Sequence, residues 1–158
     1  MKNAKLIIAF VFCFELISFS QLPKNSLGLR LGYGNYNASA EISSRHRIAE
    51  QIRIEASLGG RFSSTQSDFI TNIHLQYVMP FTELTSYYLG IGYQFSFAQT
   101  SSTFQITTDY ALGLSALFGM DYQLKKWTIS IDFRPNIDIS KPFWLAYAFG
   151  LGARYHIN

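Results

Sequence analysis

Cysteine is almost absent from this sequence of 158 residues, where Cys13 is the only one. Because Cys13 lies in an apolar run near the amino terminus, the rest of the chain has no thiol for a disulfide framework or a cysteine metal site. Charged residues are also scarce, at 15% of the chain against roughly 25% in ordinary soluble proteins. The formal net charge of +3 is too small and too scattered for nucleic-acid binding.

Helical patterning is missing as well. The longest largely apolar run, residues 6–19, falls short of the roughly twenty residues that a membrane-spanning helix needs. Lys2 and Lys5 precede it, and Ser18-Phe-Ser20 closes it with small residues two apart, a pattern typical of a cleaved secretory signal. We therefore predict an exported protein with a signal peptide at residues 1–20 and one mature domain at residues 21–158.

Period-2 alternation of apolar with small or polar residues runs through the mature part, and it is typical of β-strands. Residues 85–98 show it most clearly, with Leu89, Ile91 and Tyr93 alternating with Gly90, Gly92 and other small or polar residues. The same pattern predicts eight strands, at residues 27–34, 37–45, 52–59, 69–79, 85–98, 112–124, 127–134 and 143–157. Connections are predicted at residues 35–36, 46–50, 63–67, 80–84, 99–108, 125–126 and 136–142.

The predicted fold class is all-β, a closed antiparallel up-and-down transmembrane β-barrel. Along the predicted strands every second position is small or polar, mainly Gly, Ala or Ser. These positions would make a poor water-facing surface, but they leave volume inside a narrow barrel. In a bilayer the outward parity must be apolar, and the strands must close on themselves. The alternative is a soluble lipocalin-like ligand-binding barrel, in which the apolar parity points inward.

Aromatic residues crowd the predicted strand ends, as in the girdles of membrane barrels. The girdle on the side of the termini is predicted from Tyr77, Phe81, Tyr87, Tyr122, Trp127 and Tyr155, and the outer girdle from Phe69, Phe95, Phe97, Tyr110, Phe133 and Phe143.

The signal, the eight alternating strands and the glycine-rich closing segment Phe149-Gly-Leu-Gly-Ala-Arg-Tyr155 resemble small outer-membrane barrels of the OmpA/OmpX type. The resemblance covers nearly all of the mature part. It implies an integral protein of the bacterial outer membrane with periplasmic termini, and it brings no catalytic or binding motif with it.

The strand positions predicted to face inward carry charges of both signs, which must be paired or hydrated inside a barrel. We predict that interior ion pairs rigidify and shut the barrel; the alternative is a narrow or gated ion path. The predicted interior ion-pair residues are Arg30, Glu41, Arg53, Glu55, Arg61, Asp121, Asp132, Arg134 and Arg154.

A lipid-modifying enzyme of this size would need a histidine with a serine and a carboxylate. The three candidates are His46, His74 and His156, and none has a serine two residues on or an acidic partner at triad spacing. No pair of them has metal-ligand spacing either. We therefore predict no catalytic residue, cofactor or metal, and histidines that act as hydrogen-bonding groups.

The predicted function is a structural or partner-binding role in the cell envelope. The predicted partners are outer-membrane lipid and larger outer-membrane or periplasmic envelope proteins, of which this barrel would be an accessory subunit. Arg45, His46 and Arg47, in or beside the first predicted turn, are candidates for contact with such a partner or with anionic head groups.

Overall fold

The computed structural model describes residues 23–35, 37–63, 67–102, 105–140 and 144–157. The predicted signal at residues 1–20, with Cys13, lies outside them. No helix among the described residues is long and apolar enough to cross a membrane. The chain forms eight strands: β1 (Asn25–Gly34), β2 (Asn37–Arg47), β3 (Ile52–Phe62), β4 (Ser67–Pro80), β5 (Thr85–Ser102), β6 (Gln105–Leu124), β7 (Trp127–Asp138) and β8 (Trp144–Ile157).

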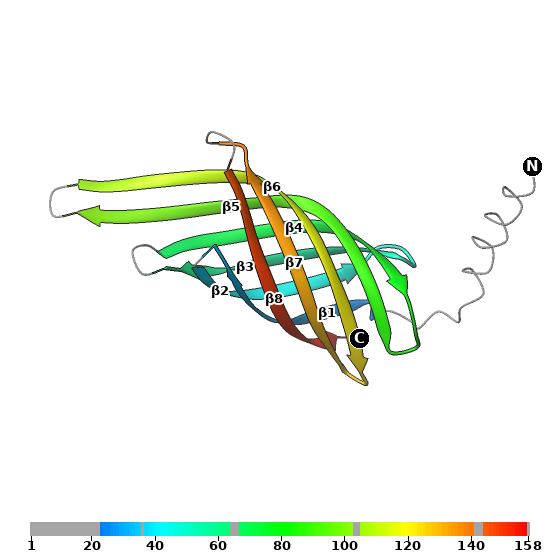
Figure 1. The fold of residues 1–158 in the computed structure, drawn as a ribbon. Helices are drawn as coiled ribbons and strands as arrows, with labels where there is room; N and C mark the ends of the chain where they lie inside the picture. The colour runs from blue at the N-terminus through cyan, green and yellow to red at the C-terminus, as the bar shows by residue number, and fades with distance from the viewer. Residues whose placement is uncertain (1–22, 36, 64–66, 103–104, 141–143, 158) are drawn as a thin grey trace, which may run out of the picture.

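The eight strands form one closed ring. Each strand pairs antiparallel with the strands before and after it, and β1 pairs with β8 to close the barrel, for example through Leu29↔Ala153 (Figure 1). The predicted fold class is therefore confirmed. The β6–β7 turn is two residues long and begins at Lys125, whose φ of 49° is the positive value that tight hairpin turns require.

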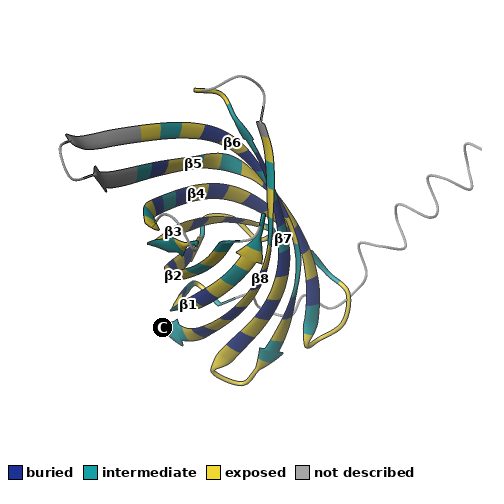
Figure 2. Ribbon diagram, turned by 60° about the vertical axis from the view of Figure 1, so that its left-hand side comes forward, coloured by how far each residue is buried: buried dark blue, intermediate teal, exposed yellow. Residues whose placement is uncertain are grey.

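The two faces of the barrel wall differ in chemistry, and buried and exposed residues alternate along the strands (Figure 2). Leu89, Ile91 and Phe149 point outward, with 46%, 71% and 59% of their surface exposed. Most of the buried side chains are instead polar or charged and point into the barrel. This orientation is opposite to that of a lipocalin-like barrel, so that alternative is wrong.

The predicted girdle residues lie near the two rims. All six on the side of the termini are exposed, as are Phe69, Phe95 and Tyr110 at the other rim. Ring contacts join neighbours along each rim, including Trp127 to Tyr155 at 5.3 Å between centroids and Phe133 to Phe149 at 5.0 Å. Phe143 lies outside the described residues.

Several strands run further than the sequence pattern predicts. The predicted connection at residues 99–108 is wrong over most of its length, because β5 continues to Ser102 and β6 begins at Gln105. Likewise β2 continues to Arg47 and β7 to Asp138. The β5–β6 segment projects beyond the ring (Figure 1): in the described residues, β4 pairs with β5 only as far as Asp68↔Ala98, and β7 with β6 only as far as Gly113↔Asp138.

One seam of the wall is interrupted by a proline. In β7, Pro135 would face Ala116 of β6, and this is where the β6–β7 pairing has a gap, between Ser115↔Asn136 and Phe118↔Phe133. Proline has no N–H to donate to the ladder. The Ser115 hydroxyl donates to the Ala116 carbonyl instead, at 3.3 Å. A side chain thus takes the place of the missing backbone donor.

We expect Ser115→Ala to lower the free energy of unfolding by about 1–3 kcal/mol, because the Ala116 carbonyl loses its donor. In the Pro135→Ala background the cost is smaller, since the restored backbone N–H can bond that carbonyl. Urea unfolding of all four chains in lipid vesicles measures this coupling. The hydrogen bond between His74 and the Ser115 hydroxyl is lost in both backgrounds and cancels. Equal losses in the two backgrounds would therefore show that the Ser115 hydroxyl does not replace the missing N–H of Pro135.

Candidate functional site: the charged barrel interior

The half of the interior away from the termini is organised around two carboxylates, Glu41 and Asp132. Because β1, β2 and β7 each turn one parity inward, Arg30 reaches both Glu41 (2.7 Å) and Asp132 (2.6 Å). Arg134 approaches the other oxygen of Glu41 at 3.1 Å. All four side chains are buried, and Ser57 donates a further hydrogen bond to Glu41 at 2.6 Å.

The half near the termini is organised around Glu55 and Asp121. Glu55 contacts Arg45 at 2.5 Å and Arg154 at 3.2 Å. Asp121 contacts Arg45 at 2.9 Å and Arg53 at 2.7 Å. Glu55 thus lies where charges from β2, β3 and β8 meet.

A longer ion pair between Arg134 and Glu55, at 3.7 Å, joins the two halves into one connected set that we call the interior network. It contains five arginines and four carboxylates, a formal net charge of +1: Arg30, Arg45, Arg53, Arg134, Arg154, Glu41, Glu55, Asp121 and Asp132. Neutral side chains such as Asn72, Gln76 and Ser43 add hydrogen bonds to it. Charge is therefore compensated locally inside the barrel, as burial requires.

Glycines on the inward parity make room for these large groups. A Cβ on Gly150 would lie 2.4 Å from an Arg30 nitrogen. A Cβ on Gly119 would lie 2.3 Å from the Tyr88 ring and 2.7 Å from the Ile131 carbonyl oxygen. The small parity in the sequence is thus the space that the charged side chains occupy.

Tyr88 closes the interior on the side of the termini. The guanidinium carbons of Arg45 and Arg53 lie 5.0 Å and 4.7 Å from its ring centroid, which is cation–π distance. Val78 and Leu117 form a buried apolar cluster with the same residue. Leu117, which breaks the alternation in the sequence, therefore helps to fill the bore.

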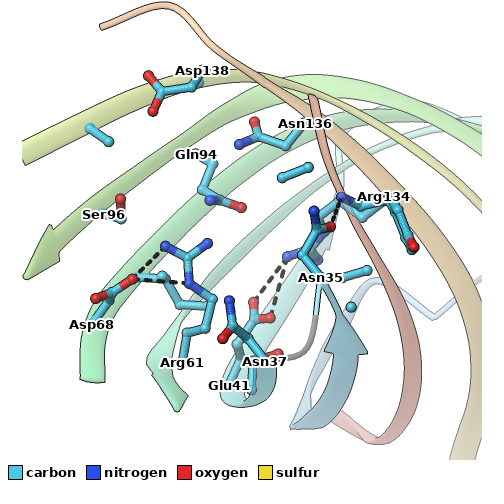
Figure 3. A pocket seen from close by; sticks show the side chains of 18 of the residues that line it. Asn35, Asn37, Glu41, Arg61, Asp68, Gln94, Ser96, Arg134, Asn136 and Asp138 are labelled. Atoms are coloured by element: carbon cyan, nitrogen blue, oxygen red, sulfur yellow. Dashed lines mark hydrogen bonds and ion pairs between the residues drawn. The ribbon is translucent and has the colours of Figure 1, made fainter. Parts of the chain in front are cut away.

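The other end of the barrel is open and holds a cavity of about 650 Å³ (Figure 3). Its lining includes Arg30, Glu41 and Arg134 of the interior network and polar side chains such as Gln94 and Asn136. Near its mouth Arg61 and Asp68 pair at 2.5 Å, with 27% and 14% of their side chains exposed.

The structure brings eight of the nine predicted ion-pair residues into the interior network. Arg61 does not join it, because it pairs with Asp68 nearer the mouth. Arg45 was predicted beside a turn, as a candidate partner contact, and this was wrong: it is buried in the network. Arg45 lies an even number of residues from Glu41 and Ser43, so the alternation could have placed its side chain inside the barrel with theirs.

The histidines are hydrogen-bonding groups. His74 is buried, with Nε2 3.0 Å from the Ser115 hydroxyl. His156 is 2.7 Å from the Thr128 hydroxyl, and His46 is 2.5 Å from the Asn25 side-chain oxygen. Within the described ranges, no three His, Cys, Asp or Glu residues are grouped so that they could hold a metal ion.

The sequence matches no family model, and a comparison with curated proteins finds no match. Solved structures are similar in fold. The N-terminal barrel of Pseudomonas aeruginosa OprF aligns with a TM-score of 0.68 at 11% identity, covering 83% of this chain and 96% of that one. Neisserial surface protein A gives 0.66 at 14% identity (84% and 94% covered), and Yersinia pestis Ail, an attachment invasion locus protein, gives 0.59 at 15% (83% and 95%). The chain thus has the fold of the eight-stranded outer-membrane barrels.

Proposed function

We propose that this chain is an integral outer-membrane protein that works as a sealed, non-enzymatic barrel with a structural or partner-binding role in the cell envelope. The interior network carries this proposal, because a bore filled by nine connected charged side chains leaves no open path for ions. An eight-stranded barrel is in any case only wide enough for its own side chains. The outward residues supply the apolar wall that a bilayer requires.

The proposed orientation places the termini and the three turns β2–β3, β4–β5 and β6–β7 in the periplasm. An even number of strands puts both termini on one side, and bacterial barrels carry their longer extensions on the extracellular side, which here is the side of the long β5–β6 hairpin. The β5–β6 hairpin then projects outward from the cell. The fold shared with OprF, NspA and Ail supports the outer-membrane location.

The sealed barrel predicts that the purified protein gives no resolved current steps in a planar lipid bilayer across positive and negative voltages. A general porin measured in the same bilayers checks that the assay detects a channel. Discrete, reproducible steps from this protein would contradict the sealed barrel and revive the narrow pore.

A partner-binding role is tested by placing a photo-activatable cross-linker at three positions in intact cells. Ile91 reports on the lipid-facing wall, Gln105 on the β5–β6 hairpin and Lys125 on the β6–β7 turn. Docking to a larger envelope protein gives a discrete adduct at one of the three positions. Adducts at none of them would leave a solitary barrel and contradict the accessory-subunit role.

The non-enzymatic role is tested on purified lipid A. We expect neither hydrolysis nor acyl transfer. Turnover that disappears in His74→Ala or His156→Ala would contradict the proposal, since these are the described histidines that contact a hydroxyl group.

A further inference from the structure

We propose that the open cavity at the β5–β6 end is a binding site for a small, uncharged, hydroxyl-rich ligand, namely a short saccharide. Its volume of about 650 Å³ falls within the roughly 300–1,000 Å³ of small-molecule sites. Its inner end meets the buried Arg30–Glu41–Arg134 ion pairs, and its opposite end is open. A ligand would therefore enter from one side only.

Buried polar groups on its wall lack partners. Asn136 is only 8% exposed and lines the cavity, yet within the described part of the chain its Oδ1 has no hydrogen-bond partner. The same is true of Nε of Arg134, which is 3% exposed. Both atoms are enclosed by the wall and have almost no accessible surface, so the polar groups within a ligand's reach are the rest of the Asn136 amide, Gln94 and Ser39, which line the cavity.

Asn136 is held in place by the strand beside it. A Cβ on Gly113 would lie 2.4 Å from Oδ1 and 2.6 Å from Nδ2 of Asn136, so the amide packs over a glycine of β6. Gln94 of β5 pairs in register with that glycine, and the hydroxyl residues Ser39 and Ser96 also line the cavity. Amides and hydroxyls both donate and accept hydrogen bonds, as the hydroxyls of a sugar do.

The charges on the wall exclude other ligand classes. Three arginines (Arg30, Arg61, Arg134) face three carboxylates (Glu41, Asp68, Asp138), a balance of zero. Arg30 and Arg134 are paired with Glu41, and Arg61 with Asp68, so a charged ligand would have to compete with existing ion pairs. An apolar ligand would cover the amides and hydroxyls of the lining without pairing them, which is costly. A neutral saccharide meets neither penalty.

The experiment titrates the folded protein in lipid nanodiscs with sucrose and, separately, with sucrose octasulfate, which has the same skeleton but many negative charges. We expect sucrose at millimolar concentration to shift the amide NMR signals of Asn136, Gln94 and Gly113, with little effect at Ser130 and Thr128 near the other end of the barrel. Tighter binding of the sulfated sugar at these signals would overturn the proposal in favour of an anion site. Shifts from neither sugar would show a cavity that holds water only, and would overturn it too.

Two variants locate the site. Asn136→Leu and Gln94→Leu are each expected to weaken sucrose binding by about tenfold, which is the loss of one well-formed hydrogen bond. Thr128→Val, a similar polar-to-apolar change in the buried interior at the far end, should leave the affinity unchanged. Gln94→Leu keeps the test decisive if Asn136→Leu fails to fold. Unchanged affinity in a folded Gln94→Leu or Asn136→Leu barrel would also refute the site.

Discussion

Replacing Glu55 by glutamine is expected to lower the free energy of unfolding by about 3–5 kcal/mol, the range for removing one partner from a buried ion pair. Glu55 contacts Arg45, Arg134 and Arg154. Its loss raises the formal charge of the interior network from +1 to +2 among side chains that are buried from solvent. Urea unfolding in lipid vesicles, followed by tryptophan fluorescence, measures the loss.

The control is Asp68→Asn, which breaks the Arg61–Asp68 pair near the mouth. Because these side chains are partly exposed, the expected loss is at most about 1 kcal/mol. If Glu55→Gln and Asp68→Asn cost the same, the network does not act as a connected buried unit.

The second large effect is expected on the outer wall. Ile91→Arg should destabilise the inserted barrel by about 2–4 kcal/mol, the usual penalty for arginine at the middle of the bilayer. Ile91 is 71% exposed and lies within β5 between Leu75 and Ala116. The fraction of folded protein in vesicles, read from its shifted mobility in gels run without heating, provides the measurement.

Leu124→Arg is the matched control. Leu124 is also exposed, but it is the last residue of β6 beside the turn, where an arginine can reach the interface at a cost of about 0–1 kcal/mol. Equal penalties at both positions would mean that the wall is not embedded in hydrocarbon at the depth that the strand positions imply.

The alternation of the sequence was enough to predict the class of fold. Residues such as Leu89 and Ile91 against Gly90 and Gly92 specify which face points outward, because a one-residue slip would reverse every side chain. The strand ends were less predictable. Ser and Thr occur in strands as readily as in loops, so the residue types at 99–108 did not distinguish a loop from a continuation of β5 and β6.

The membership of the interior network followed from the same parity, but its pairings did not. Arg30 meets Asp132 across 102 residues, and this contact depends on how far the strands are staggered around the ring. Arg45 was missed for a simpler reason: β2 was ended at residue 45, so its last arginine was assigned to the neighbourhood of a turn. The Pro135 gap and its repair by Ser115 depend on atomic geometry that no pattern of residue types contains.

The pairing of β1 with β8 has a consequence for the order of assembly. Every other strand pair is a hairpin that can form as soon as its two strands exist, whereas this one must bring the two ends of the chain together. Arg30 reaches Asp132, and Arg154 reaches Glu55, only when that closure occurs. A barrel that lacks its last strand would therefore hold arginine and carboxylate side chains apart, so burial of the charges and completion of the ring belong to a single late folding step.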